Sequence, residues 1–227
     1  MYKRRGGEKM KKALTIGLVI LLALGAVYAL YAADNVANTK HNLSSSSNGT
    51  YKLTTSMTET CIFCHTPHGA SQSIGPLWNR SAINTSGYAM YNSSTLDMTI
   101  DGTPGGVSAA CLSCHDGAVA FDSLVNFPGS GSTNPGWNWA GTGNKIANSS
   151  TAYMGKDLSN DHPISITYST TADAAFVAVN GTKVGGLPLY SSKVECGSCH
   201  NPHDNSNGTF LRISNTGSAL CLACHKK

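Results

Sequence analysis

Residues 61–69 read Cys-Ile-Phe-Cys-His-Thr-Pro-His-Gly, and residues 196–204 repeat the pattern as Cys-Gly-Ser-Cys-His-Asn-Pro-His-Asp. In both stretches, two cysteines separated by two residues are followed at once by a histidine. This spacing is the attachment signature of c-type haem, in which both thiols bond to the porphyrin and the histidine ligates the iron. A further histidine follows three residues later. Each stretch therefore predicts a haem site with an additional histidine close by.

The attachment motif occurs four times and leaves no cysteine over. Four disulfides, or two zinc sites built from paired Cys-x-x-Cys motifs, are the alternative interpretations. Neither explains why every cysteine pair is followed directly by histidine. The sequence therefore predicts four covalently bound c-type haems. The thioether-forming cysteines are Cys61, Cys64, Cys111, Cys114, Cys196, Cys199, Cys221 and Cys224, and the proximal iron ligands are His65, His115, His200 and His225.

The number of remaining histidines equals the number of sixth ligand positions on four haem irons. An iron with an open sixth position binds substrate or gas, whereas an iron held by two histidines is suited to electron transfer alone. Full use of these histidines predicts an electron carrier without catalytic residues. The predicted distal ligands are His41, His68, His162 and His203.

The second histidine of each doubled motif is expected to serve a different haem from the first. His68 follows His65 by three residues, so on a helical turn both side chains lie on one face. The haem attached at this motif separates the two sides of its own iron. His68 therefore cannot readily reach the side opposite His65. The same holds for His203 relative to His200. Each doubled motif is therefore predicted to pin two haems close together, as electron hopping requires.

The order of free histidine, doubled motif and plain motif occurs twice along the chain, which suggests duplication of a two-haem unit. Residues 34–127 form the predicted first dihaem half, residues 128–160 a Gly/Ser/Asn-rich linker, and residues 161–227 the second dihaem half. The spacing leaves exchanges of distal ligands open, within or between subunits. The pairs that the repeat predicts are His68 with His115, His203 with His225, His41 with His65, and His162 with His200.

The composition predicts little regular structure. Of 227 residues, 24 are glycine and only 12% are charged, and long runs of Ser, Thr and Asn separate the motifs. The expected fold class is mostly irregular coil with short α-helices and a small β-hairpin, with the haem stack as core. Residues 117–125 predict a short helix, and another is expected to end at the last motif. An Asn-Gly turn at residues 180–181 predicts the hairpin.

The N-terminus has the order of a secretory signal peptide. Residues 9–12 are basic, residues 13–31 are almost wholly apolar, and an alanine cluster at Ala29, Ala32 and Ala33 precedes the polar Asp34. We therefore assign residues 1–33 to a signal peptide, with an uncleaved membrane anchor as the alternative. From residue 13 onward, 10 Lys and Arg face 11 Asp and Glu. This balance argues against a nucleic-acid partner, which needs a basic face.

The doubled motifs, with residues 161–164 (Asp-His-Pro-Ile) between them, resemble those of multihaem c-type cytochromes. The tetrahaem count, the leader and residues 40–44 (Lys-His-Asn-Leu-Ser) are most similar to the OmcE-like tetrahaem cytochromes that form extracellular conductive filaments, or nanowires. The resemblance implies a homopolymer joined head to tail, with His41 ligating a haem of the neighbouring subunit. It also implies an extracellular or cell-surface location and exchange with other redox proteins or extracellular electron acceptors.

Two other classes of protein are weighed against this interpretation. A periplasmic or membrane-anchored tetrahaem electron carrier of the quinol dehydrogenase type has a similar length and keeps its leader helix. A multihaem reductase for nitrite or hydroxylamine needs at least one open haem face. The histidine count argues against the reductase.

Overall fold

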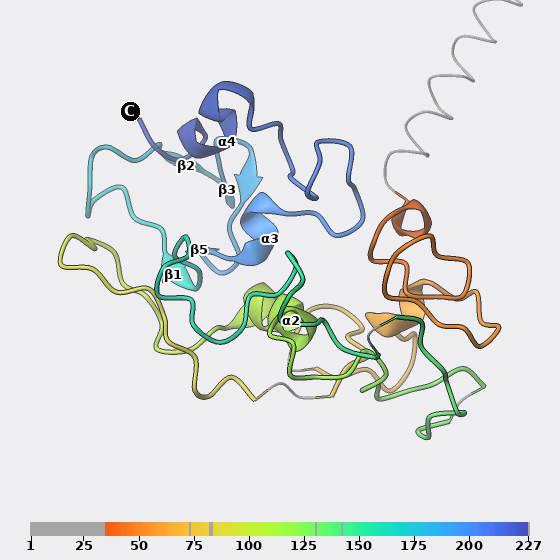
Figure 1. The fold of residues 1–227 in the computed structure, drawn as a ribbon. Helices are drawn as coiled ribbons and strands as arrows, with labels where there is room; N and C mark the ends of the chain where they lie inside the picture. Colours follow the sequence, from red (N-terminus) through yellow and green to blue (C-terminus); the bar gives the residue numbers. More distant parts are fainter. Residues whose placement is uncertain (1–34, 73, 82–83, 130, 142, 227) are drawn as a thin grey trace, which may run out of the picture. The chain divides into compact units, whose positions relative to one another are not determined.

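Most of the chain follows an irregular path, interrupted by short helices (Figure 1). The computed structural model describes residues 35–72, 74–81, 84–129, 131–141 and 143–226. The predicted leader, residues 1–33, lies outside them. The longest helix of the described residues, α2, has ten residues. The helices are η1 (Val36–Asn38), η2 (Cys61–Phe63), α2 (Gly106–His115), α3 (Cys196–Cys199), η3 (Thr216–Ser218) and α4 (Ala219–Leu222).

Two small antiparallel sheets lie in the C-terminal part of the chain. One pairs β1 (Ile166–Thr167) with β5 (Lys193–Val194). The other is a meander of β2 (Val179–Asn180), β3 (Lys183–Val184) and β4 (Leu187–Pro188). The predicted hairpin is therefore confirmed, but its turn lies one residue later than expected, because Asn180 is already paired with Lys183. A second turn then adds the third strand.

The helix predicted over residues 117–125 is wrong, because the helix lies on the haem motif itself and ends before this segment. The Asp116 side chain accepts the amide of Ala118 at 2.8 Å. Gly117 follows with φ +69°, the left-handed conformation that commonly ends a helix. A Cβ at this glycine would overlap the ring of Tyr153. These local contacts outweigh the helical pattern of the residues that follow.

The helices that carry the second and third motifs lie against each other. Helices α2 and α3 are in contact, and a Cβ on Gly197 would approach a methyl carbon of Val107 to 2.7 Å. Only glycine allows this approach without displacement of the neighbour. The glycine in the Cys-Gly-Ser-Cys sequence of the third motif is therefore explained by the packing of α3 on α2.

The apolar core is divided into small clusters. In the described part of the chain, the largest cluster of buried side chains contains Leu53, Phe63, Leu124, Phe127 and Trp137. The expectation of a mostly irregular chain with short helices and small antiparallel sheets is confirmed. Haem as the core remains a prediction.

Residues Val36–Lys227 form one unit. The division of this unit into two dihaem halves and a linker remains a prediction. None of the helices among the described residues is long and apolar enough to cross a membrane.

Candidate haem sites

Each attachment motif forms one helical turn. The helical turn expected between His65 and His68, and between His200 and His203, is wrong, because the turn ends at the first histidine of each doubled motif, which forms a β-bridge with Trp78 or Leu211. In three motifs, the histidine amide donates a hydrogen bond to the carbonyl of the first cysteine, four residues earlier. The second motif lies within α2, which ends at His115. Residues three apart lie on one face of such a turn, so both cysteines face the same way with the histidine directly after them. The hydrogen bonds run from His65 to Cys61 at 2.8 Å, from His200 to Cys196 at 3.0 Å, and from His225 to Cys221 at 2.9 Å.

All eight cysteines are free, which argues against the disulfide interpretation. Among the residues that the structure describes, no group of three or more His, Cys, Asp or Glu side chains is arranged to hold a metal ion. The cysteines are thus available for attachment.

The proximal histidines are oriented through their Nδ1 atoms. Hydrogen bonds between Nδ1 and a backbone carbonyl fix the neutral tautomer and leave Nε2 as the free ligand nitrogen. Three proximal histidines make this contact, and so does the predicted distal ligand His162, with the carbonyl of Pro163 at 3.0 Å. The proximal contacts are His65 with Pro76 at 3.1 Å, His115 with Ala152 at 2.7 Å, and His200 with Thr209 at 2.9 Å.

Two pairs of histidines have the spacing of axial ligands. A histidine nitrogen binds a transition metal at about 2 Å, so rings facing one iron from opposite sides have centroids about 6 Å apart. The ring centroids of His65 and His203 are 6.2 Å apart, with ring planes at 18°. Those of His41 and His115 are 6.1 Å apart. Both pairs of residues therefore have the separation expected for ligands of one haem iron.

These pairs differ from the ones that the repeat predicts. His41 lies beside His115 instead of His65, and His203 lies beside His65 instead of His225. The repeat pattern failed because the N-terminal segment and the second doubled motif each contact a distant part of the chain. The expectation that His203 serves a different haem from His200 remains a prediction.

His68 and His162 are both exposed. Within the described residues, no ring contact brings either of them to another histidine. Their assignment as distal ligands, like that of His225 as a proximal ligand, remains a prediction.

His41 is half-buried and is held as a neutral imidazole. Its ring packs on Phe210 at 4.3 Å, and its Nδ1 atom is buried without a hydrogen-bond partner among the described residues. Burial lowers the pKa of His41 to about 4, with a further contribution from His115. A neutral ring with an unsatisfied nitrogen is suited to ligate a metal ion.

The chain around His41 is fixed by short polar contacts. The Asn42 side chain is 1% exposed and donates to the carbonyl of Ala37 at 2.8 Å. The amide of Ser44 donates to Asn42 Oδ1 at 3.0 Å, and the amide of His41 donates to Thr39 Oγ1 at 3.2 Å. The Lys-His-Asn-Leu-Ser segment is therefore a defined turn that presents His41.

The thiols of successive motifs lie close enough to affect one another's ionisation. Burial raises the pKa of Cys64 to about 12, and the neighbouring Cys114 adds to this shift. Similar interactions between thiols occur between the first and second motifs, the second and third motifs, and the third and fourth motifs. The interacting thiols are Cys64 with Cys114, Cys111 with Cys196, and Cys199 with Cys221.

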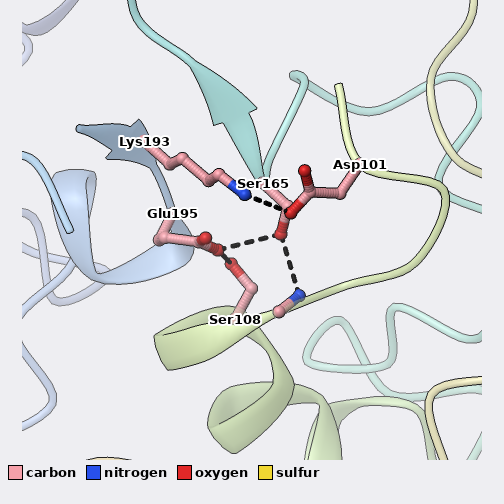
Figure 2. A network of polar contacts seen from close by, with 6 residues as sticks. Asp101, Ser108, Ser165, Lys193 and Glu195 are labelled. Atoms are coloured by element: carbon pink, nitrogen blue, oxygen red, sulfur yellow. Dashed lines mark hydrogen bonds and ion pairs between the residues drawn. The ribbon is translucent and has the colours of Figure 1, made fainter. Parts of the chain in front are cut away.

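A buried polar network joins the second and third motifs, and sequence reasoning missed it (Figure 2). Glu195 is 3% exposed and precedes the first cysteine of the third motif. Its Oε2 accepts hydrogen bonds from the hydroxyls of Ser108 on α2 and Ser165, the latter at 3.1 Å. Nearby, Lys193 is paired with Asp101 at 2.5 Å. No local pattern identifies this network, because its members come from separate parts of the chain.

Replacing Glu195 by Gln is expected to reduce the pH dependence of stability. Burial raises the pKa of Glu195, and hydrogen bonds from Ser108 and Ser165 partly offset the shift. The folded state therefore binds this proton more tightly than the unfolded state does. The stabilisation is complete below the ordinary glutamate pKa and is lost as pH rises through the raised pKa. Urea unfolding across this range should show Glu195→Gln gaining stability relative to the natural protein as pH rises.

The exposed residue Asp97 provides the matched control for this measurement. Asp97→Asn also removes one carboxylate, but away from the buried network, and should leave the pH profile of the natural protein in place. Identical profiles for Glu195→Gln and the natural protein would contradict the prediction.

The C-terminal pair of motifs is similar to a known family. Residues 190–227 match the family model of the doubled CXXCH motif. No curated protein matches the chain. The matched segment contains the third and fourth motifs and His203. It supports a multihaem c-type cytochrome-like character, and the CXXCH motifs indicate covalently bound c-type haem.

Proposed function

We propose that this protein transfers electrons through four covalently bound c-type haems, each held by two histidines, and has no catalytic activity of its own. The observation that carries the proposal is the 6.1–6.2 Å separation of two histidine pairs, because each pair contains the histidine of an attachment motif. The other two sites are proposed from the same motif, with His68 and His162 as their distal ligands.

The polypeptide has three roles in this function. The cysteines anchor the cofactors, and the helical turn of each motif places the following histidine. The carbonyl contacts at Nδ1 hold three proximal rings in one orientation. The mutual influence of the thiols supports close spacing from the first site to the fourth. When bound, haem supplies an iron that accepts and releases one electron.

Haem analysis of the mature protein tests this function. Mass spectrometry of its peptides is expected to find haem on all four motifs, and the visible and electron paramagnetic resonance spectra should be those of low-spin, six-coordinate iron. Binding of carbon monoxide by the reduced natural protein would instead support a reductase with an open haem face. Absence of haem from the motifs would contradict the proposal.

We also propose that the protein is exported through residues 1–33 and assembles head to tail into a filament at the cell surface. The contact between His41 and His115 involves a histidine near the start of the described chain. The same contact can form between copies, if His41 of one copy occupies the site beside His115 of the next. In such a head-to-tail contact, one surface of each copy binds a different surface of the next copy. The repeated contact gives an open polymer when the rotation between copies does not close a ring.

Electron microscopy of the exported protein tests the filament. Filaments are expected for the natural protein, together with loss or shortening of filaments for His41→Ala at unchanged haem content. A strictly monomeric natural protein would contradict the filament and favour a periplasmic or membrane-anchored carrier.

A further inference from the structure

Arg80 is a fully buried cation whose hydrogen-bond partners are neutral. Its side chain is 1% exposed, and it donates four hydrogen bonds to hydroxyl and carbonyl oxygens. The bonds are Nε to Ser113 Oγ at 3.0 Å, Nη2 to the Ser113 carbonyl at 3.1 Å, Nη1 to the Phe121 carbonyl at 2.9 Å, and Nη2 to the Ala120 carbonyl at 2.8 Å.

No carboxylate in the described part of the chain forms an ion pair with Arg80. Asp116, the acidic residue beside the second motif, instead accepts hydrogen bonds from the Tyr88 hydroxyl at 3.1 Å and the Ala118 amide at 2.8 Å. Burying a guanidinium without a counter-charge is costly. In a medium of low dielectric constant, its positive charge also acts strongly on neighbouring groups.

Arg80 and its neighbour Asn79 contact two attachment motifs directly. Ser113, which binds the guanidinium through its side chain and its carbonyl, is the residue between Leu112 and Cys114 of the second motif. Asn79 donates from its amide to the carbonyl of Cys64 in the first motif at 2.8 Å. Its side chain binds the carbonyl of Ile62 in the same motif at 2.7 Å. The buried charge therefore lies against the turn of the second motif, and the residue before it binds the turn of the first motif.

We propose that Arg80 sets the reduction potentials of the haems attached at the first and second motifs, raising them by its buried positive charge. The proposal rests on the function proposed above. Reduction adds one electron to the iron, supplied by a redox partner or an electrode, and so makes the site less positive. A fixed cation nearby stabilises the reduced form relative to the oxidised form, and burial and neighbouring charge are established determinants of haem potentials.

Redox titration of Arg80→Gln, followed haem by haem through NMR, tests the proposal. Glutamine keeps donors for part of the hydrogen-bond set but removes the charge. We expect reduction of the haems on the first and second motifs to become at least about tenfold less favourable, which is about 59 mV for a one-electron couple. Unchanged potentials in a variant that keeps all its haems would overturn the proposal.

Arg212 offers a matched control at another motif. It is partly buried and donates from Nε to the carbonyl of Gly197, within the third motif, at 2.6 Å. Arg212→Gln removes the same charge beside the third motif and should lower the potentials of the first two haems less than Arg80→Gln does. An equal drop in the reduction potentials of those haems in both variants would overturn the proposal that Arg80 acts locally.

Arg80→Lys provides a second test that depends on charge more than on hydrogen bonding. A buried lysine loses its proton at lower pH than an exposed one, whereas arginine stays charged. In Arg80→Lys, the first two haems should keep raised potentials at low pH and lose them as the introduced amine deprotonates, with no such step in the natural protein. A pH profile identical to that of the natural protein would overturn the proposal.

The haem content of each variant separates failure of this proposal from failure of the proposed function. Haem on all four motifs with unaltered potentials rejects only the role of Arg80. Absence of haem from the natural protein rejects the electron-transfer function. Loss of haem in Arg80→Gln and Arg80→Lys alike shows a structural role and overturns the proposal.

Discussion

His41→Ala is expected to make the reduced protein bind carbon monoxide at one site, that of the second motif. His41 and His115 are 6.1 Å apart between ring centroids, as expected for two ligands of one iron. Removal of His41 leaves the proximal histidine alone, and the open position then accepts a gas. The change should appear in the visible spectrum as high-spin iron. Added imidazole should restore the low-spin spectrum.

Lys40→Ala is the control for this experiment, because it shortens the adjacent side chain on the same turn and removes no predicted ligand. Its spectrum should match that of the natural protein. His203→Ala should give an equal response at a different site, the haem beside His65. A fully low-spin His41→Ala protein would show that His41 is not an iron ligand, in its own subunit or in a neighbour.

The parts of the fold that sequence reasoning predicted correctly are local. The short helix expected at the last motif is present as α4. The hairpin followed from the Asn-Gly pair, since Gly181 at φ +61° allows the turn. The wrong helix over residues 117–125 has an equally local cause. Asp116 and Gly117 end the helix, and the apolar pattern of the residues after them led to the wrong prediction.

The pairing of histidines and the buried charges could not be predicted in the same way. His203 reaches His65, and His41 reaches His115, across segments whose paths depend on the whole fold. An internal repeat gives the order of the motifs but not which of them meet. Arg80 has no motif around it, and its importance is visible only once four oxygens surround it. Long-range geometry decided each of these features.

The haem-free polypeptide, produced where haem attachment does not occur, is expected not to fold cooperatively. Ordering each residue costs roughly 1–2 kcal/mol of conformational entropy. Against this cost, the longest described helix has ten residues, and each named strand has two. The described apolar clusters are small, and His41 Nδ1 is buried with no hydrogen-bond partner in the part of the chain that the structure describes. We expect loss of essentially the whole free energy of unfolding, about 5–15 kcal/mol for a domain.

Circular dichroism and tryptophan fluorescence during urea unfolding measure this loss, with the mature protein as reference. A cooperative transition in the haem-free chain would contradict haem as the core of the fold.

Single sites can be compared by replacing both cysteines of a motif with serine. At the second motif, the change removes the anchor from α2, which also holds Arg80 through Ser113 and Glu195 through Ser108. At the fourth motif, where Cys221 and Leu222 are exposed, the same change should cost less stability. Equal losses at the two sites would show that the haems stabilise the chain independently of the polar networks around α2.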